Sequence, residues 1–178
     1  DKDETADQDN SRVRAIWEQE ISESQSFKAS LTYQKTEEEK IKTEFVEKFD
    51  GNGVFDKSET KNENETVESE EWRALAEYKL PVLNRHDLKV GAEFVSKDSV
   101  GSVAESKGED PLEIKPEGTF AVEEDRLMFF IQDDYSLSGR TDLALGIRGE
   151  YNDLLGESVD GTGETAEDSE LVWLPSFQ

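Results

Sequence analysis

Strict alternation of apolar and polar residues is the feature that most constrains how this chain folds. In residues 141–151, Leu143 and Ile147 belong to an apolar row, whereas Arg148 and Glu150 belong to the intervening polar row. Successive side chains of a β-strand point to opposite faces, so this pattern predicts a strand with one apolar and one polar face. Helical spacing of apolar residues is poor nearly everywhere. The sequence therefore predicts an all-β, antiparallel protein.

About seven segments of this kind recur along the chain. Each is roughly 9–12 residues long, which suits a strand that crosses a lipid bilayer, whereas strands of soluble proteins are usually nearer 5–6 residues. The apolar rows run through Val13–Trp17, Phe27–Tyr33, Trp72–Leu80, Leu88–Phe94, Leu127–Tyr135, Leu143–Tyr151 and Leu171–Phe177.

The connections between these segments alternate between short and long. An up-and-down transmembrane β-barrel with short periplasmic turns and long extracellular loops predicts this order. We therefore expect a barrel segment with long acidic extracellular loops. The expected short turns are Ile21–Ser26, Pro81–His86 and Ser138–Arg140, and the expected long loops are Thr36–Ser69, Asp98–Glu123 and Asp153–Ser169.

Charge and aromatic placement agree with this topology. The formal net charge is -24, and most of the 44 acidic residues lie in the expected long loops. The apolar rows are almost free of charge, and their exception, Asp133, lies toward an inner strand end, where a lipid-facing charge costs less than at mid-membrane. Two aromatic girdles are expected, with Tyr33, Trp72, Phe94, Tyr151 and Trp173 at the outer interface and Tyr78 and Tyr135 at the inner one.

Composition also excludes several classes of protein. The negative charge argues against nucleic-acid binding. There are no cysteines, hence no disulfide framework and no thiolate metal site, and no apolar run is long enough for a transmembrane helix. The sequence contains no recognisable nucleophile–base pair and no phosphate-binding glycine loop. We expect neither an enzyme nor a bound cofactor.

Three segments are informative beyond their alternation: EYKLPVLNRHDLKVGAEF, LMFFIQDDYSLSGRTDLALGIRGEY and LVWLPSFQ. They resemble TonB-dependent outer-membrane receptors, in particular ferric-siderophore receptors of the enterobactin and colicin I type, and the resemblance covers residues 71–178. The family often carries Ser-Pro-Arg where this chain has Leu174-Pro175-Ser176, so a role for that arginine does not carry over. The resemblance implies that residues 1–178 are a partial barrel, without the plug domain or the remaining strands.

The resemblance also implies a function and a location. It predicts an outer-membrane receptor that takes up a ferric siderophore or similar metal chelate, energised by TonB through parts outside this chain. Lipid and lipopolysaccharide would surround the wall, and the loops Thr36–Ser69 and Asp98–Glu123 would face the ligand. Two alternatives stay open: a passive porin or adhesin barrel, and a soluble acidic β-rich binding module, which would need a second layer to cover its apolar rows.

Three basic residues are the candidate ligand contacts, because they belong to polar rows expected to face the lumen: Arg73, Lys89 and Arg148. They could guide an anionic ferric chelate. The simpler interpretation is that each pairs with a carboxylate on a neighbouring strand or on the plug. The available carboxylates are Glu77, Glu93 and Glu150.

No metal site is predicted. Residues 50–59 contain closely spaced oxygen ligands, but counting from Asp50 places Phe55 and Lys61 where an EF-hand needs Gly and Glu. We therefore expect a glycine-rich loop tip. His86 is the single histidine and is expected to have a structural role in a periplasmic turn. The acidic loops could bind divalent cations that bridge lipopolysaccharide, although a solvated surface is the simpler interpretation.

Overall fold

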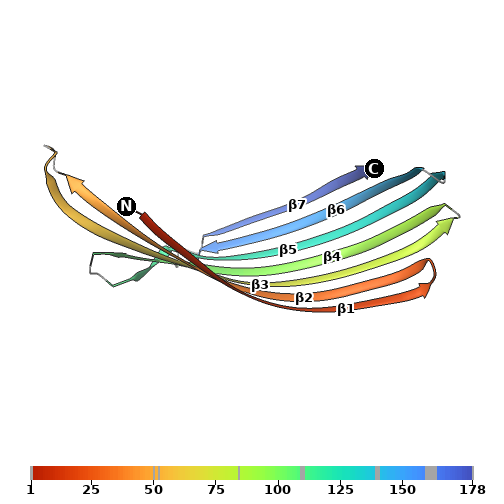
Figure 1. Cartoon of the computed structure of the whole chain (residues 1–178), viewed down its shortest axis with the longest axis horizontal. Helices are drawn as coiled ribbons and strands as arrows, with labels where there is room; N and C mark the ends of the chain where they lie inside the picture. The colour runs from red at the N-terminus through yellow and green to blue at the C-terminus, as the bar shows by residue number, and fades with distance from the viewer. Residues whose placement is uncertain are drawn as a thin grey trace.

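The chain forms one antiparallel β-sheet whose seven strands lie in chain order (Figure 1). The computed structural model describes residues 2–49, 51, 53–83, 85–108, 111–138, 141–158 and 164–177. The strands are β1 (Lys2–Ser22), β2 (Gln25–Phe49), β3 (Phe55–Leu83), β4 (His86–Lys107), β5 (Glu113–Ser138), β6 (Thr141–Ser158) and β7 (Thr165–Phe177). The predicted all-β, antiparallel, up-and-down fold is confirmed. Within the described ranges, no helix is long and apolar enough to cross a membrane.

The segments expected to be long loops are mostly strand, and that expectation was wrong. β2 and β3 stay paired as far as Phe49 and Phe55, so Thr36–Ser69 is largely an extended hairpin. β3 has 29 residues, which corresponds to roughly 95 Å of extended chain. A ladder is held by backbone hydrogen bonds, which do not require alternating side chains. Outside the membrane neither face has to be apolar, so the strands continue after their sequence signature ends.

The strand registers bring the predicted apolar rows onto one face of the sheet. Ile131 lies opposite Val90 on β4 and opposite Ile147 on β6. Phe27 and Tyr78 likewise lie opposite each other in the ladder between β2 and β3. We call this face the apolar face. The opposite one, which carries Arg73, Lys89 and Arg148, we call the polar face.

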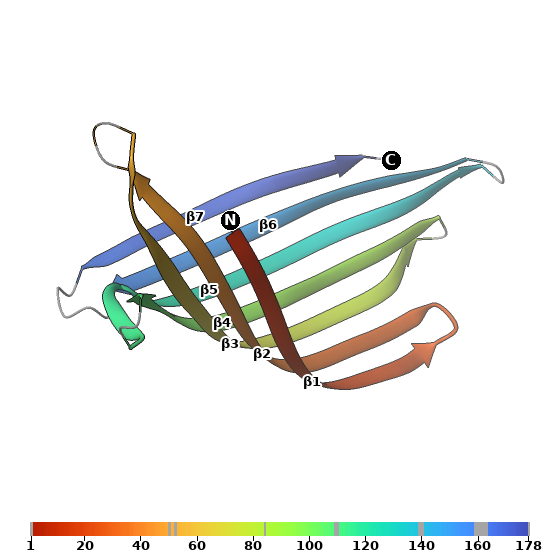
Figure 2. The same ribbon diagram turned by 60° about the vertical axis from the view of Figure 1, so that its left-hand side comes forward.

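Burial is inverted relative to a soluble sheet. From Glu71 to Glu77 and from Glu123 to Ile131, residues on the apolar face are exposed, whereas those on the polar face are buried or half-buried. The side chains of Thr32, Val95 and Met128 are at most 7% exposed, and all three lie on the polar face. The sheet is curved and twisted (Figures 1 and 2), and the low exposure of the polar face is what its concave side would show. Apolar residues outside and polar residues inside are the arrangement of a membrane barrel wall.

The aromatic residues follow the sheet diagonally. At the outer ends of the apolar rows, the rings of Tyr33 and Trp72 are directly opposite each other, with centroids 4.7 Å apart. Tyr151 and then Trp173 lie on rows progressively nearer the short turns. Barrel strands are tilted against the barrel axis, so a belt at constant height must step along the rows from strand to strand. The positions are those expected of an outer girdle in a tilted sheet.

Candidate ligand-facing wall

The polar face carries the three predicted contacts, but the sheet does not gather them into one cluster. Arg73 lies on β3, Lys89 on β4 and Arg148 on β6, and no two of them are ladder partners. Each lies beside a carboxylate. Their side chains are 42%, 37% and 47% exposed respectively, so each remains accessible from the polar face.

Arg73 has two carboxylate partners. Its Nη2 lies 3.1 Å from Glu71 Oε1, two residues earlier on β3, and its Nε lies 3.4 Å from Glu93 Oε1 on β4. Exposed pairs of this kind contribute about 0–1 kcal/mol each. The pairs therefore fix the position of the guanidinium more than they stabilise the sheet.

Lys89 is held from two sides. Its Nζ lies 3.1 Å from Glu77 Oε2 on β3 and 5.9 Å from the ring centroid of Phe130 on β5. Phe130 itself lies over Gly91, where an added Cβ would be 2.5 Å from the ring Cζ and 2.9 Å from the carbonyl oxygen of Ala76. Glycine is thus required at this position for the ring to lie flat against the sheet.

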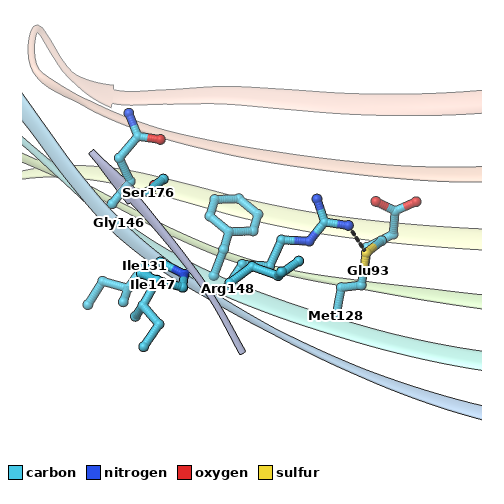
Figure 3. A pocket seen from close by; sticks show the side chains of 11 residues that line it. Glu93, Met128, Ile131, Gly146, Ile147, Arg148 and Ser176 are labelled. Atoms are coloured by element: carbon cyan, nitrogen blue, oxygen red, sulfur yellow. Dashed lines mark hydrogen bonds between the residues drawn. The ribbon is translucent and has the colours of Figure 1, made fainter. Parts of the chain in front are cut away.

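Arg148 borders a hollow of about 450 Å³ over β4–β7 (Figure 3). It forms an ion pair with Glu150, and its Nη2 donates to Met128 Sδ at 2.7 Å. Glu93 lies on the same side, so guanidinium, carboxylate and thioether groups face the hollow together. A ligand in the hollow would meet charged groups and the polarisable sulfur of Met128. The residues that line the hollow do not bring an acid and a base together at one position.

Each of the three carboxylates expected as partners therefore forms an ion pair: Glu93 with Arg73, Glu77 with Lys89 and Glu150 with Arg148. Arg126, which was not predicted as a contact, shares a row of the polar face with Arg73. Within the part of the chain that the structure describes, the buried Arg126 Nε has no hydrogen-bond partner. Its even position in β5, the strand that contains Met128 and Phe130, places it on the polar face, and the sequence alone could have indicated this.

The charged exception in the apolar rows has a partner. Asp133 Oδ2 lies 2.7 Å from Nδ1 of His86, which begins β4, and the imidazole stacks on Tyr135 with ring centroids 4.4 Å apart. The pair explains how a carboxylate is accommodated on the apolar face near a short turn. The structural role predicted for His86 agrees with this contact.

Ion pairs also tie the outer hairpins together. Lys42 pairs with Glu63 across β2 and β3, and Lys40 Nζ lies 2.9 Å from Glu4 Oε1 across β1 and β2. The hydrogen bond with Glu63 raises the pKa of Lys42, and the hydrogen bond from Lys40 lowers the pKa of Glu4. Lys48 likewise lowers the pKa of Glu59 near the tip of the β2–β3 hairpin. Asp50 and Asn52, two of the oxygen ligands considered for a calcium loop, lie outside the described residues.

Several solved structures have a similar fold. The ferric citrate transporter FecA in its unliganded form is similar with a TM-score of 0.66 at 11% identity, covering 94% of this chain and 24% of that one. BauA, the ferric preacinetobactin receptor from Acinetobacter baumannii, gives 0.63 at 11% identity, with 97% and 28% covered. The ferric-catecholate import receptor Fiu from E. coli K12 gives 0.56 at 10% identity, with 97% and 32% covered.

These likenesses show the fold, and the chain spans only about a quarter to a third of the length of these structures. No curated protein matches the sequence. The model of the outer membrane protein beta-barrel family matches residues 20–178, which is most of the chain. This match agrees with the inverted burial of the sheet and with its location in the bacterial outer membrane. The chain belongs to the outer membrane protein beta-barrel family.

Proposed function

We propose that this chain is part of the wall and outer hairpins of a TonB-dependent receptor that takes up a ferric siderophore or a similar metal chelate. The observation that carries the proposal is the sheet itself: an inverted barrel wall whose strands run far beyond membrane length into paired outer hairpins. The solved structures that are similar in fold include transporters and receptors of ferric chelates. The resemblance in residues 71–178 supports the same assignment.

In this account the two faces of the sheet have different partners. The apolar face contacts lipid and the lipid portion of lipopolysaccharide, whereas Arg73, Lys89 and Arg148 face the lumen. Their carboxylate partners hold the cations in place, and their exposed portions are free to meet a ligand or the plug domain. A ligand that approaches from outside meets the hairpins of β2–β3 and β4–β5 first. Energy from TonB would act through the plug, outside this chain.

Uptake of radioactive iron tests the proposal. Cells that produce the whole receptor should accumulate iron from a chelate that it recognises, and saturably. Uptake should disappear when the receptor gene is deleted, and also when TonB is absent while the receptor is still produced. Uptake that persists without TonB would indicate a passive porin and would contradict the proposal. Failure of every chelate to be bound or transported would also contradict it.

A further inference from the structure

The outer hairpins place nearly all of their lysines on one face. The ladder between β2 and β3 has no register shift from Ser26 and Lys79 out to Lys48 and Lys57, so the two faces continue without interruption into the hairpin. Carboxylates lie on both faces, in the row Asp9, Glu37 and Glu68 on the continuation of the apolar face and at Glu44, Glu63 and Glu105 on the polar face. The lysines are the residues that are sorted. Of the lysines in the described outer parts of β1–β4, only Lys35 lies on the continuation of the apolar face. The others lie on the polar face: Lys2, Lys40, Lys42, Lys48, Lys57, Lys61, Lys97 and Lys107.

Lysines of the polar face meet at a hollow of about 360 Å³ over the outer parts of β1–β4. One row across the four strands contains Lys2, Glu44, Lys61 and Lys107 in that order. Three ammonium groups thus share a row with a single carboxylate. The net charge of the whole chain gives no indication of this local excess of positive charge.

Lys61 and Lys107 are direct ladder partners. Like charges directly opposite each other on one face destabilise a sheet, because their Cβ atoms are only about 4.5–5.5 Å apart. Neither lysine forms an ion pair with any residue that the structure describes, and the nearby Glu59, whose pKa is lowered mainly by Lys48 and also by Lys107, is already paired with Lys48. An anion between the two ammonium groups would convert this repulsion into two charge-assisted contacts.

The next row sets a limit on where such an anion fits. It contains Lys42, which pairs with Glu63, and then Glu105 directly opposite Glu63. Glu105 faces the same hollow and would repel an anion that moves away from the lysine row. The hollow is therefore polarised, with an anion-attracting row on its outer side and a carboxylate row on its inner side.

We propose that this hollow binds an anionic group of the ligand, such as a carboxylate, between Lys61 and Lys107. The inference rests on the proposed function and adds the substrate class: a chelate that carries negative charge. It also gives a purpose to the placement of the described lysines of β1–β4, since all of them except Lys35 lie on the face that would line the entrance. Attraction of this kind raises the local concentration of an anionic ligand and weakens with added salt.

Binding by the whole receptor in detergent tests the proposal, with iron(III) complexes of citrate, of a tricatecholate and of an aminocarboxylate as anionic probes. Ferrioxamine B, a cationic trihydroxamate complex, is the opposite probe. Lys61→Gln and Lys107→Gln should each weaken binding of the recognised anionic probe by about tenfold, the size expected for one charge-assisted contact. Glu105→Gln should tighten binding. Lys35→Gln, on the other face of the same hairpin, is the matched control and should leave binding unchanged.

Thermal unfolding separates a lost contact from a misfolded hairpin. Lys107→Gln removes a like-charge pair, so the melting temperature should stay the same or rise while affinity falls. If an anionic probe binds but the two lysine substitutions do not affect it, or if only ferrioxamine B binds, the inference is wrong and the receptor proposal stands. If no probe of either charge binds, the receptor proposal itself fails, and the inference with it.

Discussion

The inner and outer halves of this sheet share one hydrogen-bonded ladder, yet their side chains obey different rules. In the inner half, apolar residues such as Leu145 and Ile147 face one side and polar residues such as Arg148 face the other. In the outer half both faces are polar, and all of the described lysines of β1–β4 except Lys35 lie on the polar face, where carboxylates accompany them. Backbone pairing therefore defines the strands, whereas the surroundings select the side chains. A strand that contacts lipid needs an apolar row, whereas a strand in water can carry charged residues on either face.

The largest expected effect comes from placing a charge in the lipid-facing row. Ile131→Arg should destabilise the folded barrel by about 2–4 kcal/mol, the cost of an arginine at the bilayer midplane. Two control variants test whether the cost depends on the face and on the depth in the membrane. Gln132→Arg on the polar face and Val100→Arg on the outer continuation of the apolar face should each cost less than about 1 kcal/mol. Urea unfolding in phospholipid vesicles measures all three. Equal costs at the three positions would contradict the difference between the two halves.

The next effect concerns the one charge that the apolar rows contain. His86→Ala should cost about 1–3 kcal/mol, because it leaves the Asp133 carboxylate without its hydrogen bond in an apolar setting. Replacing both residues by alanine should cost less than His86→Ala alone, since no unpaired carboxylate remains. Unfolding of the two single variants and the double variant gives the coupling energy. Strict additivity would show that the pair is not coupled.

A somewhat smaller effect is expected where a ring lies flat on the wall. Gly91→Ala should destabilise the sheet by about 1–2 kcal/mol, because the new Cβ would meet Phe130 and the Ala76 carbonyl oxygen. Phe130→Leu should recover part of this loss by relieving the ring contact. The comparison is made by thermal unfolding of both variants and their combination. If Gly91→Ala is neutral by itself, the close approach of the ring is not tight.

The smallest effect is a pH dependence confined to the outer half. The hydrogen bond from Lys48 lowers the pKa of Glu59 in the folded hairpin. The pair therefore stabilises the hairpin fully above the carboxyl pKa of the unfolded chain, and this stabilisation disappears as the pH falls through the lowered folded pKa. Hydrogen exchange should show weaker protection near the hairpin tip in acid. Lys48→Gln should remove this dependence, and protection that weakens equally in the variant would argue against the pair.

The inner half could be predicted from the sequence because contact with lipid requires an apolar residue at every second position. The row from Leu127 to Ile131 and the polar position of Arg148 both follow from counting residues in twos. The lengths of the outer hairpins could not be predicted, since residues 36–69 carry no such period and resemble polar loops. Their strands are held by backbone hydrogen bonds and by cross-strand pairs such as Lys42 with Glu63.

Contacts across strands were the other part that the sequence left open. Asp133 was recognisable as a charge in an apolar row, but its pairing with His86 depends on the register between β4 and β5. The same is true of Lys61 and Lys107, which are far apart in the chain and become neighbours only through the β3–β4 ladder. Alternation assigns a residue to a face, and register decides which residues meet there.

Accessibility of single cysteines along β5 tests the central claim most directly. This chain has no cysteine, so a single one can be placed at each position from 126 to 132 and spin-labelled in membranes, in a whole receptor whose other cysteines, where present, are replaced by serine. The account predicts that labels at 127, 129 and 131 are accessible to oxygen dissolved in lipid, whereas labels at 126, 128, 130 and 132 are shielded from it. Labels that respond alike at odd and even positions, or that show the opposite alternation, would contradict a barrel wall with its apolar face in lipid.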